Sequence, residues 1–247
     1  MENASYFAAS TTKLFITTVI LQLQAKGLLR LDDCIAKYLD PKLIHQLHFW
    51  RGRDYSHEIS IRHLLSHTSG LADYFEQAPK GKETLRSQLV KGHDRSWDLQ
   101  YVLDLAKAKG AQFPPAYKKK ALYSDTNFQL LGQLLESILK QELASIFAER
   151  IFAPLGLRQT YLYTDPNDTT PVPLHYKRRP LHIPEAMTSF GSDGGIVSTS
   201  GDMMQFIQAF FEGRLFPSAY LTKIQDWRNI FFPLQYGVGL SRFRLPR

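Results

Sequence analysis

The sequence contains few of the residues from which a covalent clamp or a thiolate metal site could be built. It has a single cysteine, Cys34, among 247 residues. An intrachain disulfide and a cysteine-based zinc site are therefore both excluded. The compartment stays open between the bacterial cytoplasm and the cell envelope, because exported proteins can also lack disulfides.

Long apolar runs and a basic leader are also lacking. The apolar run 14–23 is interrupted by Thr17, Thr18 and Gln22, and it is much shorter than the roughly 20 residues that span a bilayer. We expect it to form a buried helix and predict no membrane span. The opening residues 1–3 are polar and acidic, so we expect no signal peptide in this chain.

The excess of positive charge has no pattern typical of nucleic-acid binding. The formal net charge is +7 and the isoelectric point is near 9.4. The densest basic runs, 118–120 and 177–179, are short and far apart, and no aromatic residues recur beside them for base stacking. We interpret these runs as two solvated loops and predict no nucleic-acid partner.

Hydrophobic periodicity predicts a mainly helical chain. Connections are expected at 42–58 and 164–186, and a loosely packed stretch at 76–96. A strand is expected to begin near 236–240. The helices predicted from apolar spacing, caps and breakers are 10–26, 35–39, 59–66, 97–109, 127–139, 143–151 and 200–211.

The strongest chemical signal is the run Ser10-Thr11-Thr12-Lys13 at the start of an apolar helix. Residues three apart lie on one helical face, so the amine of Lys13 can approach the hydroxyl of Ser10. A helix N-terminus also offers free backbone N–H groups and a positive dipole end to an oxyanion. Taken alone, the four residues also fit an N-cap serine followed by a solvated lysine.

A catalytic role would require Lys13 to lose its proton. An ordinary lysine has a pKa of about 10.4, and keeping it neutral at pH 7 costs about 4.6 kcal/mol. Burial and a second cation nearby can both lower the pKa of a lysine. We therefore predict that Lys13 is buried, has a lowered pKa and acts as a base or proton shuttle.

Several longer blocks resemble the serine β-lactamase and penicillin-binding-protein superfamily, especially class C enzymes and related esterases. They follow that family's order and extend over nearly the whole chain. The blocks that carry the resemblance are 7–14, 21–39, 59–71, 123–132 and 194–202.

The resemblance implies an α/β (α+β) fold with a helical lobe and an antiparallel sheet. It predicts one catalytic domain over 1–247, with 1–40 and 187–247 on the sheet side and 41–186 as the helical lobe. Strands of the family's sheet are expected to be missing at both ends. The family's third motif, Lys-Thr-Gly or His-x-Gly, would follow Arg247. We expect either a truncated enzyme or a reduced, inactive relative.

The resemblance also implies roles for two residues outside the first helix. Tyr123 takes the place of the tyrosine that shares proton transfer with the lysine. Asp125 stands where many relatives have asparagine. An ionised aspartate only accepts hydrogen bonds, so this substrate-binding residue disfavours β-lactams and favours other acyl substrates.

The predicted function is acyl transfer to a small ester, amide or β-lactam. Ser10 attacks the carbonyl, Lys13 and Tyr123 move the proton, the Ser10 backbone N–H helps to hold the oxyanion, and water hydrolyses the acyl-enzyme. No metal or organic cofactor is implied. His63 and His67 have a metal-ligand spacing, but the resemblance gives that segment a structural part. The alternative is an inactive binding or regulatory protein. The sequence indicates no oligomeric state.

Overall fold

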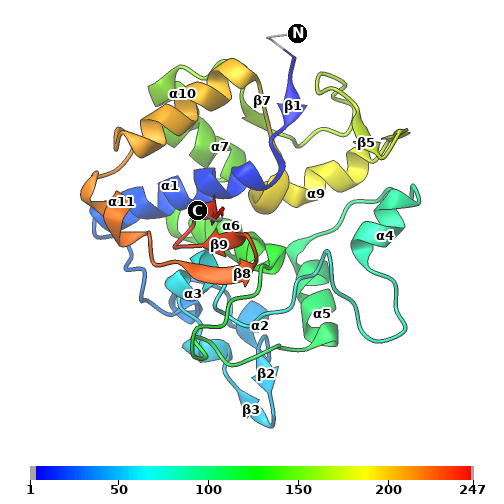
Figure 1. Cartoon of the computed structure of the whole chain (residues 1–247), viewed down its shortest axis with the longest axis vertical. Helices are drawn as coiled ribbons and strands as arrows, with labels where there is room; N and C mark the ends of the chain where they lie inside the picture. The colour runs from blue at the N-terminus through cyan, green and yellow to red at the C-terminus, as the bar shows by residue number, and fades with distance from the viewer. Residues whose placement is uncertain (1–3, 246–247) are drawn as a thin grey trace.

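The computed structural model describes residues 4–245, which form a helical framework with four small antiparallel sheets (Figure 1). The longer sheets have the strand orders β1-β7-β4 and β10-β9-β8, and β2-β3 and β5-β6 are hairpins. This arrangement confirms the predicted fold class. The strands are β1 (Tyr6–Phe7), β2 (Phe49–Trp50), β3 (Arg53–Asp54), β4 (Tyr161–Leu162), β5 (Leu174–Tyr176), β6 (Arg179–Leu181), β7 (Ile196–Ser198), β8 (Arg228–Phe231), β9 (Leu234–Tyr236) and β10 (Ser241–Phe243).

The helices carry most of the core. Single turns of 3₁₀ helix are η1 (Ala9–Thr11), η2 (Ile35–Lys37) and η3 (Ser56–Glu58), and η4 (Ala148–Phe152) is a π-helical turn. The α-helices are α1 (Thr12–Ala25), α2 (Pro41–Ile44), α3 (Ile61–Leu65), α4 (Leu85–Val90), α5 (Leu99–Lys109), α6 (Asp125–Leu139), α7 (Leu143–Phe147), α8 (Ala153–Leu155), α9 (Pro184–Gly194), α10 (Ser200–Phe211) and α11 (Ala219–Lys223). Among the residues described, no helix combines the length and apolarity that a membrane span needs.

Helix α1 lies at the centre of the molecule (Figure 1). Its side chains are apolar on all sides and mostly fully buried, as a central helix requires. Phe15 stacks on Phe206 of α10 with ring centroids 3.7 Å apart. On another side the hydroxyl of Thr17 donates to the carbonyl of Gly239, 3.1 Å away. Packing on every side therefore holds the first turn of α1 in place.

The sheet β1-β7-β4 positions the start of α1. Tyr6 pairs with Ser198 and Phe7 with Val197, and the Ala8 N–H donates to the Ile196 carbonyl at 2.8 Å. The chain then turns directly from β1 through η1 into α1. The end of α9, which leads into β7, is thereby brought beside the first turn of α1.

Helices α6 and α9 cross closely because a glycine lies at their contact. A Cβ atom added to Gly132 would lie 2.5 Å from the Cβ of Ser192. Both helices deliver residues to the first turn of α1: α6 begins at Asp125, and α9 ends with Asp193 and Gly194. The crossing therefore sets the positions of polar groups around α1.

Two predicted connections contain strands and a helix. The segment 42–58 includes most of α2, the hairpin β2-β3 and η3, and 164–186 includes the hairpin β5-β6. The expectation of unstructured connections was wrong there. These strands have two or three residues and no apolar alternation, as Arg179-Pro180-Leu181 illustrates, so the periodicity that marks a half-buried strand is missing.

The Gly132→Ala variant should destabilise the fold. The added methyl group cannot enter the α6–α9 contact without moving Ser192, and overpacking of this kind costs roughly 1–3 kcal/mol. The free energy of unfolding from urea titration measures the effect.

Gly201→Ala is the matched control, because nothing lies within 4 Å of a Cβ at Gly201 in α10. It should leave stability unchanged or raise it slightly, since alanine is the better helix former. Equal losses in the two variants would show that the α6–α9 crossing is not close-packed.

Candidate active site

Ser10 lies at a strained turn in front of α1. Ala9, which precedes it, has φ 47, a left-handed conformation that residues with a Cβ adopt at an energetic cost. The strain is enforced by the pairing of β1 with β7 on one side and by the buried helix on the other. Such strain is concentrated at functional sites. It places the side chain of Ser10, an exposed residue, at the mouth of the helix.

Lys13 is buried directly beneath the serine. Its side chain is 2% exposed, and its Nζ donates to Ser10 Oγ at 3.2 Å and to the Asp193 carbonyl at 2.6 Å. The same nitrogen lies 2.7 Å from Asp125 Oδ1. A buried ammonium group is tolerated only when its hydrogens are satisfied and its charge is compensated. These three oxygens meet both requirements.

Tyr123 reaches the nucleophile from the loop before α6. Its hydroxyl donates to Ser10 Oγ at 2.8 Å. The structure therefore brings all four residues singled out in the sequence, Ser10, Lys13, Tyr123 and Asp125, into one contiguous site. Their chemical roles stay predictions.

The expected lowering of the lysine pKa was wrong. Burial by itself would lower the pKa of Lys13, but attraction to Asp125, and then to Tyr123 and Asp193, outweighs it and raises the pKa well above the ordinary value. The reason is the identity of the neighbour: a carboxylate occupies the position where the prediction needed a second cation. Lys13 is therefore an ammonium ion in the resting site.

Tyr123 is also protonated in the resting site. Burial raises its pKa; the charge of Lys13 lowers it, and the charge of Asp125 raises it again. Ser10 Oγ thus accepts hydrogen bonds from two protonated groups. Nucleophilic attack requires that one of the two first loses its proton.

A second set of polar side chains fixes the groups around Lys13. The carboxyl of Asp193 is 2% exposed, and its Oδ2 accepts from the Tyr74 hydroxyl at 2.9 Å and from Gln129 Nε2 at 3.0 Å. Burial first, and then repulsion by Asp125, raise the pKa of this carboxyl well above its ordinary value. Sequence analysis missed these three residues. The only signal was the position of Asp193 directly before the Gly194-Gly195 block.

His67 supports the tyrosine. Its ring is fully buried and stacks on Tyr123 with centroids 4.5 Å apart, and Tyr236 packs edge-on against it at 4.3 Å. Its Nδ1 accepts from the Ser124 N–H at 3.1 Å. Burial, and then the charge of Lys13, lower the pKa of His67 well below its usual value, so the ring is neutral. It acts as an uncharged platform that orients the phenol.

His63 has a different partner, despite the spacing of four. Its Nδ1 accepts from the backbone N–H of Ser60 at 3.2 Å, which completes the N-terminal cap of α3. Within residues 4–245, no group of three His, Cys, Asp or Glu side chains is placed to hold a metal ion. The structural part that the resemblance gave this segment agrees with these contacts.

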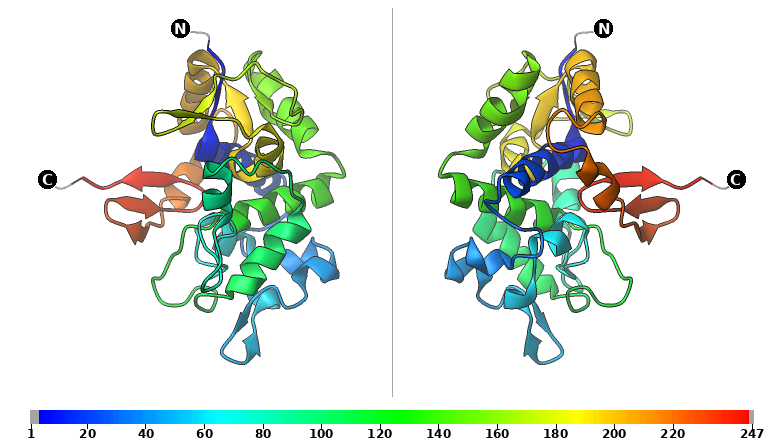
Figure 2. Two further views of the ribbon diagram at one scale, coloured as in Figure 1. Left: turned by 90° about the vertical axis from the view of Figure 1, so that its right-hand side faces the viewer. Right: turned by 90° about the vertical axis from the view of Figure 1, so that its left-hand side faces the viewer.

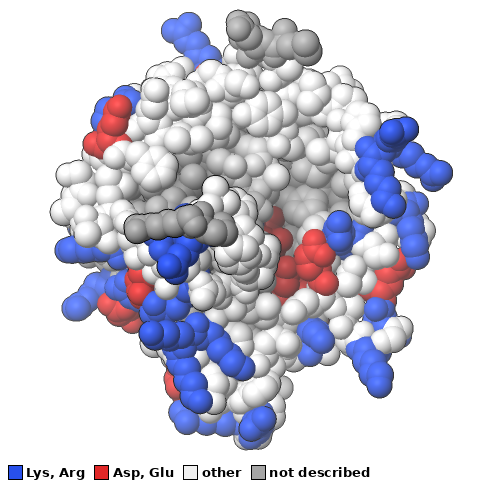
Figure 3. Space-filling model, viewed as in Figure 1, with Lys and Arg blue, Asp and Glu red and all other residues white. Residues whose placement is uncertain are grey.

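Carboxylates surround the serine. Asp125 is 13% exposed beside it, and Asp73 is 3% exposed. Burial, and then repulsion by Asp125, raise the pKa of Asp73 to about 7. Figure 3 shows acidic residues gathered at the hollow near the middle of this face. A positively charged group entering the hollow would be attracted there.

The Asp125→Asn variant should shift the alkaline rise of Ser10 reactivity to lower pH. The carboxylate raises the pKa of both Lys13 and Tyr123, so its removal lowers both, whichever of them supplies the base. The expected shift is roughly one to three pH units. The rate of Ser10 labelling by a fluorophosphonate probe between pH 6 and 11 measures it. An unchanged profile would show that Asp125 does not control the base.

The Asp73→Asn variant should stabilise the protein above pH 7 and have little effect below pH 4. Asp73 has a higher pKa folded than unfolded, so the folded state binds more protons and its stability falls as pH rises from about 4 to about 7. Asparagine removes this loss, which is up to about 4 kcal/mol. Urea unfolding at pH 4 and pH 8 tests the difference, because an effect equal at both pH values would exclude titration as the cause.

Comparison with known proteins gives one family over nearly the whole chain. The family described as Beta-lactamase matches residues 2–237. The D-alanyl-D-alanine-carboxypeptidase/endopeptidase AmpH of Escherichia coli (strain K12) is 27% identical over 202 residues, which is 82% of this chain and 48% of that protein. The chain thus spans about half the length of the curated relatives it matches first.

Solved structures give the same fold. A D-stereospecific amidohydrolase from Streptomyces sp. superimposes with a TM-score of 0.79 at 29% identity, covering 98% of this chain and 72% of that one. The D-amino acid amidase from Ochrobactrum anthropi SV3, complexed with L-phenylalanine, gives a TM-score of 0.77 at 26% identity and covers 99% and 67%. These relatives and the carboxypeptidase bear the names of enzymes that act on D-configured substrates.

Proposed function

Because the chain belongs to the β-lactamase family, we propose that it is a serine hydrolase that forms an acyl-enzyme at Ser10 and acts on D-amino acid amides or short peptides with a free amino terminus. The relatives support the D-configured acyl group. The observation that carries the free amino group is the carboxylate of Asp125, held 2.7 Å from Lys13 at the bottom of an acidic hollow.

The reaction divides the proton movements between Tyr123 and Lys13. After Tyr123 loses its proton, the ammonium of Lys13 stabilises the phenolate, since opposite charges in contact favour the ionised form. Ser10 Oγ then bonds to the substrate carbonyl carbon, and its proton passes to the phenolate. Tyr123 returns that proton to the leaving nitrogen as the C–N bond breaks. Water, deprotonated by the same group, releases the acid and restores Ser10.

Asp125 suits a substrate ammonium better than a substrate amide. An ionised carboxylate only accepts hydrogen bonds, whereas an amide side chain both donates and accepts. A substrate ammonium beside Asp125 also supplies the second cation that Lys13 lacks in the resting site. Like charges disfavour each other, so the bound substrate would lower the pKa of Lys13 and of Tyr123. Substrate binding would thereby generate the base.

Hydrolysis should depend on the free amino group and on Asp125 together. We expect kcat/KM for D-phenylalaninamide to exceed that for N-acetyl-D-phenylalaninamide by roughly 10- to 100-fold, the range given by one charge-assisted hydrogen bond. In the Asp125→Asn variant the two substrates should become nearly equal. Chromatographic assays of released acid give both values. A preference for the acetylated amide, or for the L-enantiomers, would contradict the proposed substrate class.

Covalent labelling separates an enzyme from an inactive relative. A fluorophosphonate or fluorescent penicillin should add its mass to the peptide that contains Ser10, as read by mass spectrometry, and the Ser10→Ala variant should remain unlabelled. Equal behaviour of the two proteins would overturn the hydrolase and favour a binding or regulatory protein on the same scaffold.

A further inference from the structure

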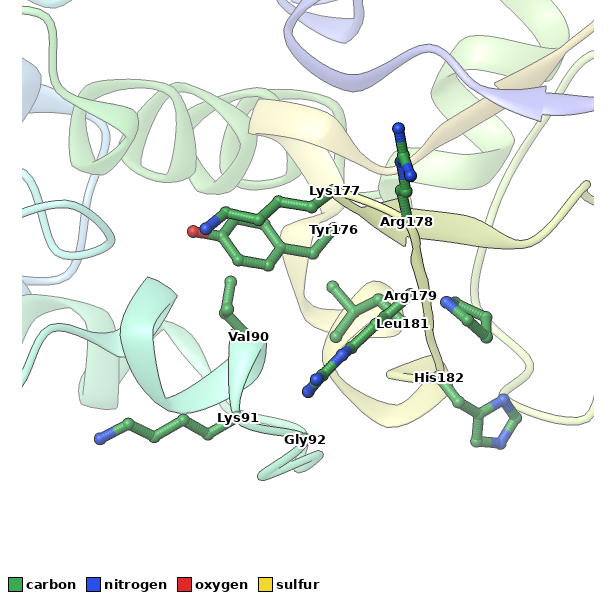
Figure 4. A pocket seen from close by; sticks show the side chains of 10 residues that line it. Val90, Lys91, Gly92, Tyr176, Lys177, Arg178, Arg179, Leu181 and His182 are labelled. Carbon is green, nitrogen blue, oxygen red and sulfur yellow. The ribbon is translucent and has the colours of Figure 1, made fainter.

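A basic cavity lies between the end of α4 and the hairpin β5-β6 (Figure 4). Its volume is about 870 Å³, within the range of small-molecule sites. Five basic side chains from the two elements line it, Lys91, Lys177, Arg178, Arg179 and His182. We call it the hairpin cavity. None of its lining residues belongs to the site around Ser10.

The positive charges of the hairpin cavity are largely uncompensated. Lys91 has a carboxylate partner, Glu83, at 2.6 Å. No ion pair of the described residues includes Lys177, Arg178 or Arg179. Three adjacent cations without counter-charges repel one another, and a bound anion would relieve that repulsion.

The turn of the hairpin is not composed for stability. Lys177 and Arg178 form a two-residue connection between the paired residues Tyr176 and Arg179. Lys177 has φ 57, the left-handed region that two-residue hairpin turns commonly fill with glycine or asparagine. A lysine there is conformationally unfavourable, so stability of the turn does not explain its presence. A role for its charge does.

The geometry favours several separated carboxylates over a compact phosphate. Phosphate sites commonly use a helix N-terminus or converging backbone N–H groups, whereas α4 presents its C-terminal end, with Lys91 as its cap. The negative end of that helix dipole opposes a compact anion. In Figure 4, Lys177, Arg178 and Arg179 diverge, with the apolar side chains of Val90 and Leu181 nearby. An extended chain with spaced acidic groups matches that arrangement.

The hairpin cavity is connected to the catalytic residues by a single helix. Helix α9 begins three residues after β6 and ends with Asp193, whose carbonyl accepts from Lys13. Its 11 residues span roughly 16 Å, the length of about five residues of extended peptide. Figure 3 shows acidic residues at the central hollow and basic residues along the right-hand edge of the same face.

We propose that the hairpin cavity binds the acidic side chains of an extended peptide substrate, about five residues beyond the scissile bond on its leaving-group side. The ammonium end of the peptide would then lie at the acidic hollow and its carboxylates at the basic cavity. The catalytic half of this assignment rests on the proposed function, but binding in the cavity does not require turnover.

The test is the affinity of the Ser10→Ala chain for a peptide with D-phenylalanine at its free N-terminus, three glycines, three glutamates and a C-terminal fluorophore. Fluorescence anisotropy gives Kd. Changing Lys177, Arg178 and Arg179 to glutamine should weaken binding roughly tenfold, the combined effect of three exposed ion pairs. A twin peptide with three glutamines should bind both proteins equally weakly.

The matched control removes the same number of charges elsewhere. Lys26, Arg30 and Lys140 are exposed and, within the described chain, take part in no ion pair. They lie at or beyond the C-terminal ends of α1 and α6. Their change to glutamine should leave Kd within about twofold if the cavity binds the peptide specifically. An equal loss in the two triple variants would reduce the effect to net charge and overturn the proposal.

Further arms separate the alternatives. Equal affinity for the glutamate and glutamine peptides would overturn the proposal, as would binding of pyrophosphate through Lys177, Arg178 and Arg179 without binding of the peptide. In the active chain, the cavity variant should lower kcat/KM for the acidic peptide and leave that for D-phenylalaninamide unchanged. Cavity-dependent binding without any hydrolysis would retain the cavity and reject the proposed reaction.

Discussion

The buried ammonium group of Lys13 is the constraint on which the site depends. With only 2% of its side chain exposed, it would cost several kcal/mol if left unpaired. The oxygens that compensate it come from Asp125 at 2.7 Å and from the carbonyl of Asp193 at 2.6 Å. Helices α1, α6 and α9 must therefore meet at one point, and the close contact at Gly132 is one condition for that meeting.

The same charge explains why the resting site is unreactive and how a substrate could change it. Asp125 keeps both Lys13 and Tyr123 protonated, so the nucleophile has no base until the local charge alters. A substrate ammonium would alter it in the required direction, because it weakens the hold of the carboxylate on the lysine. Specificity and activation would then be two effects of one contact.

Charge is also distributed over a longer range. The net charge of +7 says little by itself, because the catalytic hollow is acidic while a basic cavity lies about one helix length away. The run 177–179, interpreted from the sequence as a solvated loop, is a hairpin turn at the edge of that cavity. The separation of the two charged regions would give an extended substrate a single preferred orientation.

The sequence by itself determined what depends on neighbours a few residues apart. The approach of Lys13 to Ser10 follows from helical spacing, and the resemblance identified Tyr123 and the unusual Asp125. Tertiary structure decided the rest. The direction of the lysine pKa depends on residues more than a hundred positions away, because electrostatic energy follows distance in space. Asp193, with Tyr74 and Gln129 on its carboxyl, and the platform of His67 carry no local pattern, since their function arises only where packed helices bring them together.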